Sequence, residues 1–233
     1  MLYLDLTRHI RHFCFIEARS PRINRWVVHV KYRRQLTYSK LWEYRTPGIP
    51  DELFERTEEV PITKEDIRAI AISKLRLREG HSAIDVGCGS GSIAVELCLQ
   101  TKGSVYAIDF DQNAVDLTKK NLHKFGVKAE VILGKAQDVL PKLPQVDAVM
   151  VGGTWGDTRQ VIELAVGKLK KGGRIVIDTI LIETMYQALA TINELELAEV
   201  DITQITISKA RKVTTGTMML ARNPVMIISA TKA

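Results

Sequence analysis

Ten residues, AIDVGCGSGS at positions 83–92, combine residue types that suit the binding of a small polar ligand. Gly87, Gly89 and Gly91 stand at alternate positions after a short apolar run, and a helical pattern follows at once. Each glycine loses more backbone entropy on folding than any other residue, so three in one turn indicate that bare backbone is needed there. A helix that begins after such a turn also offers free N–H groups to a ligand.

The spacing of the glycines argues against two common nucleotide sites. The dinucleotide fingerprint is GxGxxG, and here Ser92 stands where its last glycine would be. A phosphate-binding P-loop needs GKS or GKT after its last glycine, and neither occurs at this turn. Asp85 adds a carboxylate two residues before the first glycine, inside the end of the same apolar run.

A second carboxylate, Asp109, ends the next apolar run, SVYAID at 104–109. At the end of the second strand of an open α/β sheet, a carboxylate accepts hydrogen bonds from both ribose hydroxyls and repels a 2′-phosphate. Capping of the following helix is the other role open to Asp109, but Asp111 is better placed for it. We therefore predict that Asp109 binds a ribose.

The strands and helices that position these residues are predicted from Thr46 onward, where short apolar runs alternate with longer amphipathic segments. That alternation predicts an α/β fold, a mostly parallel, Rossmann-like sheet with helices on both faces. The last two strand patterns have no helix between them, only KARKVTTGTMMLARN, so they must pair as an antiparallel C-terminal hairpin. Helices are predicted at 63–77, with Thr63 as a hydroxyl cap, and at 90–100, 111–124, 158–169 and 183–194. Seven strands are predicted, at 82–87, 104–109, 129–133, 146–151, 172–180, 200–208 and 224–229.

Composition and charge limit the class of protein. The 233 residues, 45% of them apolar, suffice for one α/β domain, and no apolar run approaches the roughly 18 residues that a membrane span needs. Residues 1–45 carry ten Lys/Arg and three Asp/Glu, whereas residues 46–233 carry 23 and 24. We expect residues 1–45 to be a poorly ordered basic extension, or a wrongly assigned start, ahead of the domain. Cys14, Cys88 and Cys98 form no CxxC pair, which favours a reducing cytoplasm.

The combination of Asp85, the GxGxG turn, Asp109 and a C-terminal antiparallel hairpin resembles the class I S-adenosylmethionine-dependent methyltransferases. In that family the seventh strand inserts antiparallel into the sheet, and the glycine turn runs under the methionine part of S-adenosylmethionine. The resemblance therefore implies this cofactor and no metal.

Longer segments are similar to the decarboxylating cobalt-precorrin methyltransferases of anaerobic cobalamin synthesis. These segments, which run from Thr46 to the C-terminus, are GIPDELF, VPITKEDIRA, VGGTWGD and GTMMLARNPVMIIS. The similarity implies methyl transfer to the carbon 15 meso position of a cobalt-precorrin, with loss of carbon dioxide from the ring C acetate. It also implies a homo-oligomer, with tetramers frequent in the family.

The family's site can be carried over residue by residue. The residues implied in cofactor binding are Thr63, Asp85, Gly87, Cys88, Gly89, Ser90, Gly91, Asp109 and Ala136. Lys135 departs from the family, which more often has an acid before that alanine. The residues implied at the substrate pocket are Gly153, Thr154 and Trp155, together with Arg211 and Arg222, because an anionic tetrapyrrole needs cations around it. Lys209 and Lys212 are further candidates, whereas the catalytic acid or base stays unassigned.

Three other functions stay open on the sequence alone. A methyltransferase acting on RNA would use the basic extension to bind phosphates, although the Asn-Pro-Pro-aromatic motif of amine-methylating relatives is absent at GGTW. A non-catalytic protein on the same fold is disfavoured by the intact Asp85, glycine turn and Asp109. A nicotinamide oxidoreductase is disfavoured by the glycine spacing and the terminal hairpin.

Overall fold

The computed structural model describes residues 41–154 and 156–233. Most of the basic extension predicted at 1–45, and Trp155 with it, therefore lie outside the described residues. Among the helices of the described part, none has the length and apolar character that crossing a bilayer requires.

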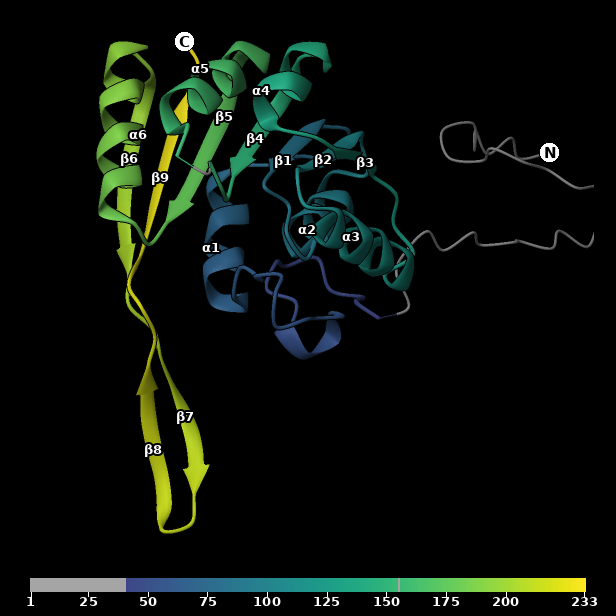
Figure 1. The fold of residues 1–233 in the computed structure, drawn as a ribbon, viewed down its shortest axis with the longest axis vertical. Helices are drawn as coiled ribbons and strands as arrows, with labels where there is room; N and C mark the ends of the chain where they lie inside the picture. Colours follow the sequence, from purple (N-terminus) through teal and green to yellow (C-terminus); the bar gives the residue numbers. More distant parts are fainter. Residues whose placement is uncertain (1–40, 155) are drawn as a thin grey trace, which may run out of the picture. The chain divides into compact units, whose positions relative to one another are not determined.

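A seven-stranded sheet forms the centre of the fold, in the order β3-β2-β1-β4-β5-β9-β6 (Figure 1). The first five strands in this order are parallel, whereas β9 pairs antiparallel with both β5 and β6. The sequence prediction of a mostly parallel sheet closed by an antiparallel strand is confirmed. The strands are β1 (Ala83–Val86), β2 (Val105–Asp109), β3 (Glu130–Leu133), β4 (Val146–Val151), β5 (Leu169–Thr179), β6 (Ala198–Ile205) and β9 (Val225–Thr231).

Helices cover both faces of this sheet, because successive strand residues alternate between two apolar clusters. On β1, for example, Ile84 and Val86 pack with α4, α5 and α6, whereas Ala83 packs with α1, α2 and α3. The helices are α1 (Glu65–Lys74), α2 (Ser92–Thr101), α3 (Gln112–Lys124), α4 (Ala136–Val139), α5 (Thr158–Lys168) and α6 (Ile182–Glu194), with short 3₁₀ turns at η1 (Asp51–Leu53) and η2 (Leu140–Lys142).

The segment KARKVTTGTMMLARN is not the plain connection that the sequence analysis assumed. It folds into a second antiparallel hairpin of β7 (Ser208–Val213) and β8 (Gly216–Ala221), with Arg211 opposite Met218. This hairpin projects away from the sheet between β6 and β9 (Figure 1). Its residues are largely exposed, so the pairing is not explained by contacts with the sheet.

A buried charge network holds the lead-in segment against the first helices. The guanidinium of Arg68 on α1 is fully buried, donates to Glu96 Oε1 at 2.7 Å and lies 3.3 Å from Asp51 Oδ1. It also donates to the carbonyls of Ile49 and Thr63, while Glu96 accepts the N–H groups of residues 48 and 49. Residues 48–63 are thereby tied to the core by an ion-pair network rather than by secondary structure.

The same network corrects the expected start of α1. Thr63 makes no capping hydrogen bond; instead Asp51 Oδ1 accepts the N–H of Glu65 at 2.9 Å. The carboxylate from η1 therefore supplies the cap that a hydroxyl was expected to supply, and it does so from a position 14 residues earlier in the chain. The side chain of Thr63 is left free to face a cavity.

Candidate functional site

The glycine turn between β1 and α2 is required by the protein's own packing. Gly87, Gly89 and Gly91 have φ values of +75°, +52° and +76°, in the left-handed region that favours glycine. A Cβ on Gly87 would lie 2.9 Å from the backbone nitrogen of Gly153, and one on Gly91 would lie 2.8 Å from Cα of Thr118. Bare backbone is thus needed so that neighbouring segments can approach the turn.

Asp109 lies at the end of β2, where the sequence places it, and it is tied to the glycine turn. Its Oδ2 accepts the N–H of Gly89 at 2.9 Å, and its Oδ1 accepts the N–H of Asp111 at 3.0 Å. Asp111 is the N-cap of α3, as predicted, since its side chain accepts the N–H of Asn113. A carboxylate has about four acceptor positions, so Asp109 retains capacity for hydroxyl donors while its orientation is fixed.

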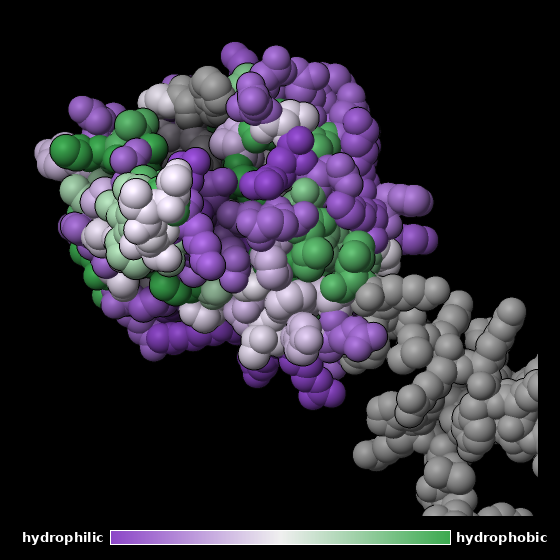
Figure 2. Space-filling model, turned by 90° about the horizontal axis from the view of Figure 1, so that it is seen from below, coloured by the Kyte–Doolittle hydropathy of each residue, from purple (hydrophilic) through white to green (hydrophobic). Residues whose placement is uncertain are grey.

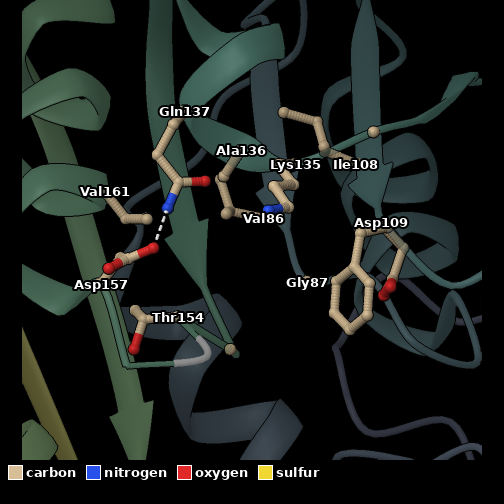
Figure 3. A pocket seen from close by; sticks show the side chains of 13 residues that line it. Val86, Gly87, Ile108, Asp109, Lys135, Ala136, Gln137, Thr154, Asp157 and Val161 are labelled. Carbon is tan, nitrogen blue, oxygen red and sulfur yellow. Dashed lines mark hydrogen bonds between the residues drawn. The ribbon is translucent and has the colours of Figure 1, made fainter.

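A first cavity of about 190 Å³ opens beside Asp109 (Figure 3). Asp109 lies on one side of it, and Gln137 and Asp157, joined by a 2.6 Å hydrogen bond, lie on the other, with Ala136 between them. The lining comprises Val86, Gly87, Ile108, Asp109, Phe110, Gly134, Lys135, Ala136, Gln137, Gly153, Thr154, Asp157 and Val161. The mixture of apolar side chains and a few polar groups is typical of a pocket for an aromatic ring that carries polar atoms.

Two larger cavities, of about 670 and 650 Å³, also border the turn. Each is within the size range of small-molecule sites. The second cavity has Asp109 and Asp111 in its wall, and the third has Thr63, Lys64 and Arg222. Both are lined by Pro61, Gly87, Gly89, Gly152, Asp178, Thr179 and Ile180, so these shared residues mark where the two cavities meet.

The structure brings most of the residues singled out by sequence to these cavities. Those that line at least one of them are Thr63, Gly87, Cys88, Gly89, Asp109, Ala136, Gly153, Thr154 and Arg222. Asp85, Ser90 and Gly91 lie behind the turn and line none of the three. All three are buried, so they shape the turn from within.

The cations expected around the substrate divide into two groups. Arg222 lines the third cavity, and its Nη1 is buried without a hydrogen-bond partner among the described residues. Lys209 on β7 instead pairs with Asp66 at 2.7 Å, which raises the pKa of that lysine. Arg211 and Lys212 are exposed on the projecting hairpin and line none of the three cavities.

Two buried carboxyl groups have strongly raised pKa values. Burial, together with the charges of Asp178 and Asp109, raises the pKa of Asp85 to about 8. Burial also raises the pKa of Asp178, at the end of β5, to about 7. One oxygen of each carboxyl group lacks a hydrogen-bond partner in the described part of the chain.

Asp178 is the acid that the sequence analysis overlooked. The signal was present, because it ends the apolar run RIVID just as Asp109 ends VYAID. Parallel strands bring their carboxyl ends to one edge of the sheet, so an acid at the end of the fifth strand belongs to the same crevice.

Comparison with known proteins agrees with this geometry. Residues 52–232 match the family model described as a precorrin methyltransferase domain. The chain belongs to the precorrin methyltransferase family. A relative from Saccharolobus solfataricus, described as a probable cobalt-precorrin-6B C(15)-methyltransferase (decarboxylating), is 44% identical over 196 residues, which is 82% of this chain and 98% of the relative.

Solved structures show the same fold in other members of the family. A protein of Methanobacterium thermoautotrophicum, titled precorrin-8w decarboxylase, superposes with a TM-score of 0.75 at 34% identity and covers 78% of this chain and 98% of its own. A precorrin-6Y C5,15-methyltransferase from Geobacter metallireducens also gives a TM-score of 0.75, at 28% identity, over 82% of this chain and all of its own. The predicted resemblance and the enzyme class, a methyltransferase, are confirmed.

Proposed function

We propose that residues 46–233 form an S-adenosylmethionine-dependent enzyme that methylates carbon 15 of a cobalt-precorrin and decarboxylates the ring C acetate, in cobalamin biosynthesis. The observation that carries the proposal is the pair of joined cavities at the glycine turn, with Asp109 in the wall of one and Arg222 in the wall of the other. The function described for the 44% identical relative from Saccharolobus solfataricus supports the choice of substrate. Cys88 and Cys98 are free thiols, which supports a reducing, cytoplasmic setting.

The residues beside the glycine turn fit S-adenosylmethionine. Asp109 is buried, held by two backbone N–H groups, and still has acceptor capacity for ribose hydroxyls on the cavity side. Ala136 belongs to the first cavity, where an adenine ring fits, and Thr63, Cys88 and Gly89 belong to the third, where the methionine portion fits. When bound, this cofactor supplies an electrophilic methyl group on a sulfonium.

The part of the third cavity beside Lys64 and Arg222, together with the exposed rim, fits the edge of an anionic macrocycle. Arg222 has a buried nitrogen there that no described residue pairs with, and Lys64 is a second cation, so acetate and propionate groups find partners. Ile180 and Leu181 are 60% and 58% exposed at the rim of the neighbouring cavity, which suits the apolar faces of a flat ring. Positioning of this kind can remove about 7–11 kcal/mol of a barrier to transfer between two bound reactants.

The experiment has two stages. Calorimetry with S-adenosylhomocysteine tests the cofactor site, and absence of binding to the folded protein would refute the cofactor proposal. Mass spectrometry of a supplied cobalt-precorrin then reads methyl gain and carbon dioxide loss separately. A salt-dependent affinity for RNA that is lost on deletion of residues 1–45, with no turnover of the precorrin, would favour the RNA methyltransferase instead.

We also propose that the β7–β8 hairpin joins copies of this chain into a homo-oligomer. An isolated two-stranded hairpin is at best marginally stable in water, and this one exposes Val213, Met218, Met219 and Leu220 by 42–63%. Figure 2 views the molecule from the end to which the hairpin points and shows green, apolar atoms exposed among purple, hydrophilic ones. Light scattering should show an oligomer that Met219→Glu dissociates, and a monomeric wild-type protein would refute this proposal.

A further inference from the structure

Asp178 occupies a distinctive place, since it lines both large cavities at their junction. On the side of the second cavity lie Asp109, which is proposed to bind ribose, and Asp111, the N-cap of α3. On the side of the third lie the cations Lys64 and Arg222. Asp178 is therefore located where residues fitted to the cofactor adjoin the cations fitted to an anionic substrate.

The surroundings leave one oxygen of this carboxyl group buried but without a hydrogen-bond partner in the described part of the chain. Gly152, the residue after β4, lies beside it, and a Cβ added there would lie 3.5 Å from Asp178 Oδ1. Because residue 152 is a glycine, no side chain covers the acid from that direction. Oδ1 has no hydrogen-bond partner in residues 41–154 and 156–233, although it is buried. Burial keeps the pKa of this carboxyl at about 7, so much of it is protonated at neutral pH.

The proposed reaction requires a proton at one step. When the ring C acetate loses carbon dioxide, the bond between its methylene carbon and its carboxylate carbon breaks, and the bonding pair enters the conjugated macrocycle. The methylene carbon must then gain a proton, which completes a methyl group. The established methyl transfer does not provide this proton at the acetate, so a general acid within reach of the substrate is needed.

We infer that the Asp178 carboxyl group is the general acid that protonates the acetate-derived methylene carbon after loss of carbon dioxide. This inference rests on the proposed function. In this step the O–H bond of Asp178 breaks, a C–H bond forms on the substrate, and the resulting carboxylate regains its proton from water. Arg222 and Lys64 hold the other acid groups of the substrate while Asp178 faces the reacting side chain.

Other ionisable groups around Asp178 bear on its titration. Asp85 on β1 is coupled to Asp178, since the charges of Asp178 and of Asp109 on β2 both raise the pKa of Asp85. Burial is what raises the pKa of Asp178 itself. The remaining ionisable groups that line the two cavities are Glu59, Lys64, Cys88, Asp111 and Arg222. A bound substrate with several carboxylates would partly neutralise Arg222 and Lys64, so the carboxyl of Asp178 stays protonated in the complex.

Asp178→Asn tests the inference in single-turnover assays of the full chain with a cobalt-precorrin. Because general acids contribute about 10²–10⁴-fold, we expect the decarboxylation rate to fall by at least about 100-fold. The affinity for S-adenosylhomocysteine should stay within about threefold of wild type, and Asp178→Glu should recover part of the rate. Glu183→Gln, which removes an exposed carboxylate five residues away that lines neither cavity, is the matched control and should behave as wild type.

The pH profile distinguishes an acid from a merely structural residue, and solvent deuterium tests the protonation step itself, whichever group donates. In wild type the decarboxylation rate should decline as pH rises through about 7. The residual rate of Asp178→Asn should not show this decline. In D₂O the new methyl group should carry one deuterium from solvent. A tenfold loss of S-adenosylhomocysteine affinity in Asp178→Asn would instead assign the acid to cofactor binding and overturn the inference.

Failure of the inference differs visibly from failure of the proposed function. If wild type yields no methylated or decarboxylated product, the proposed function fails, and the assignment of Asp178 fails with it. If wild type turns over and Asp178→Asn decarboxylates within about threefold of its rate, only the role of Asp178 is refuted.

Discussion

Replacement of Arg68 by methionine tests how the cofactor site is anchored. Arg68 is fully buried, and its partners Glu96 and Asp51 are only 1% and 5% exposed. The substitution keeps most of the apolar volume but leaves two carboxylates inside the protein without their main counter-charge. Removal of one member of a buried ion pair typically costs about 3–5 kcal/mol.

The expected thermal effect follows from that free energy. For a domain of this size, each kcal/mol corresponds to a shift of about 2–4 °C, so Arg68→Met should lower the melting temperature by roughly 6–20 °C. Urea denaturation gives the free energy of unfolding directly. The double variant Arg68→Met/Glu96→Gln should lose less free energy of unfolding than the sum of the two single losses, by at least about 1 kcal/mol. The reason is that the double variant no longer contains the unpaired carboxylate of Glu96.

The matched control is Arg159→Met, since Arg159 also pairs with two carboxylates, those of Glu163 and Glu194. Its side chain is 63% exposed, so solvent screens both pairs and the loss should be below about 1 kcal/mol. If Arg68→Met and Arg159→Met lost the same free energy of unfolding, the argument from burial would be refuted.

Three further predictions concern the glycine turn and its two acids. Asp109→Ala should weaken binding of S-adenosylhomocysteine about 10- to 100-fold in calorimetry, because hydrogen bonds to a charged group contribute about 1.5–3 kcal/mol. An unchanged affinity would exclude the ribose role of Asp109. Gly91→Ala should reduce the free energy of unfolding in urea by about 2–4 kcal/mol, since the φ of Gly91 is +76° and the new Cβ would lie 2.8 Å from Thr118. A loss below about 1 kcal/mol would contradict this prediction. The folded pKa of Asp85 is raised to about 8, so its stabilising contribution is present below about pH 4 and is lost as pH rises to about 8. Asp85→Asn should therefore become more stable relative to wild type across that interval, and parallel pH profiles would show that Asp85 does not titrate this way.

Much of the sheet and half of the site were predictable from sequence, because they depend on local signals. Apolar runs that end in an acid or in glycine locate Asp85, the turn and Asp109 at the carboxyl edge of parallel strands. The cap at Asp111 follows from its position just before an amphipathic run. Each of these signals lies within a few residues of the structure it specifies.

The features that were missed depend on partners far apart in the sequence. Thr63 has the right residue type for a cap, but Asp51 reaches Glu65 from η1, and no pattern near Thr63 reveals that. The β7–β8 hairpin lacks an alternating apolar pattern, since its residues face no core of this chain. The unpaired oxygen of Asp178 is likewise visible only once β4 brings Gly152 beside it.

The position of β9 has a consequence for how the chain reaches its folded state. This strand is the last in sequence, yet it lies between β5 and β6 and hydrogen-bonds to both. Until it is present, β6 has no neighbour in the sheet and β5 has an unpaired edge that includes the apolar residues 175–177. During synthesis on the ribosome, the nascent chain must therefore keep that edge from pairing with other chains, and assembly of the sheet is completed only when the final strand emerges.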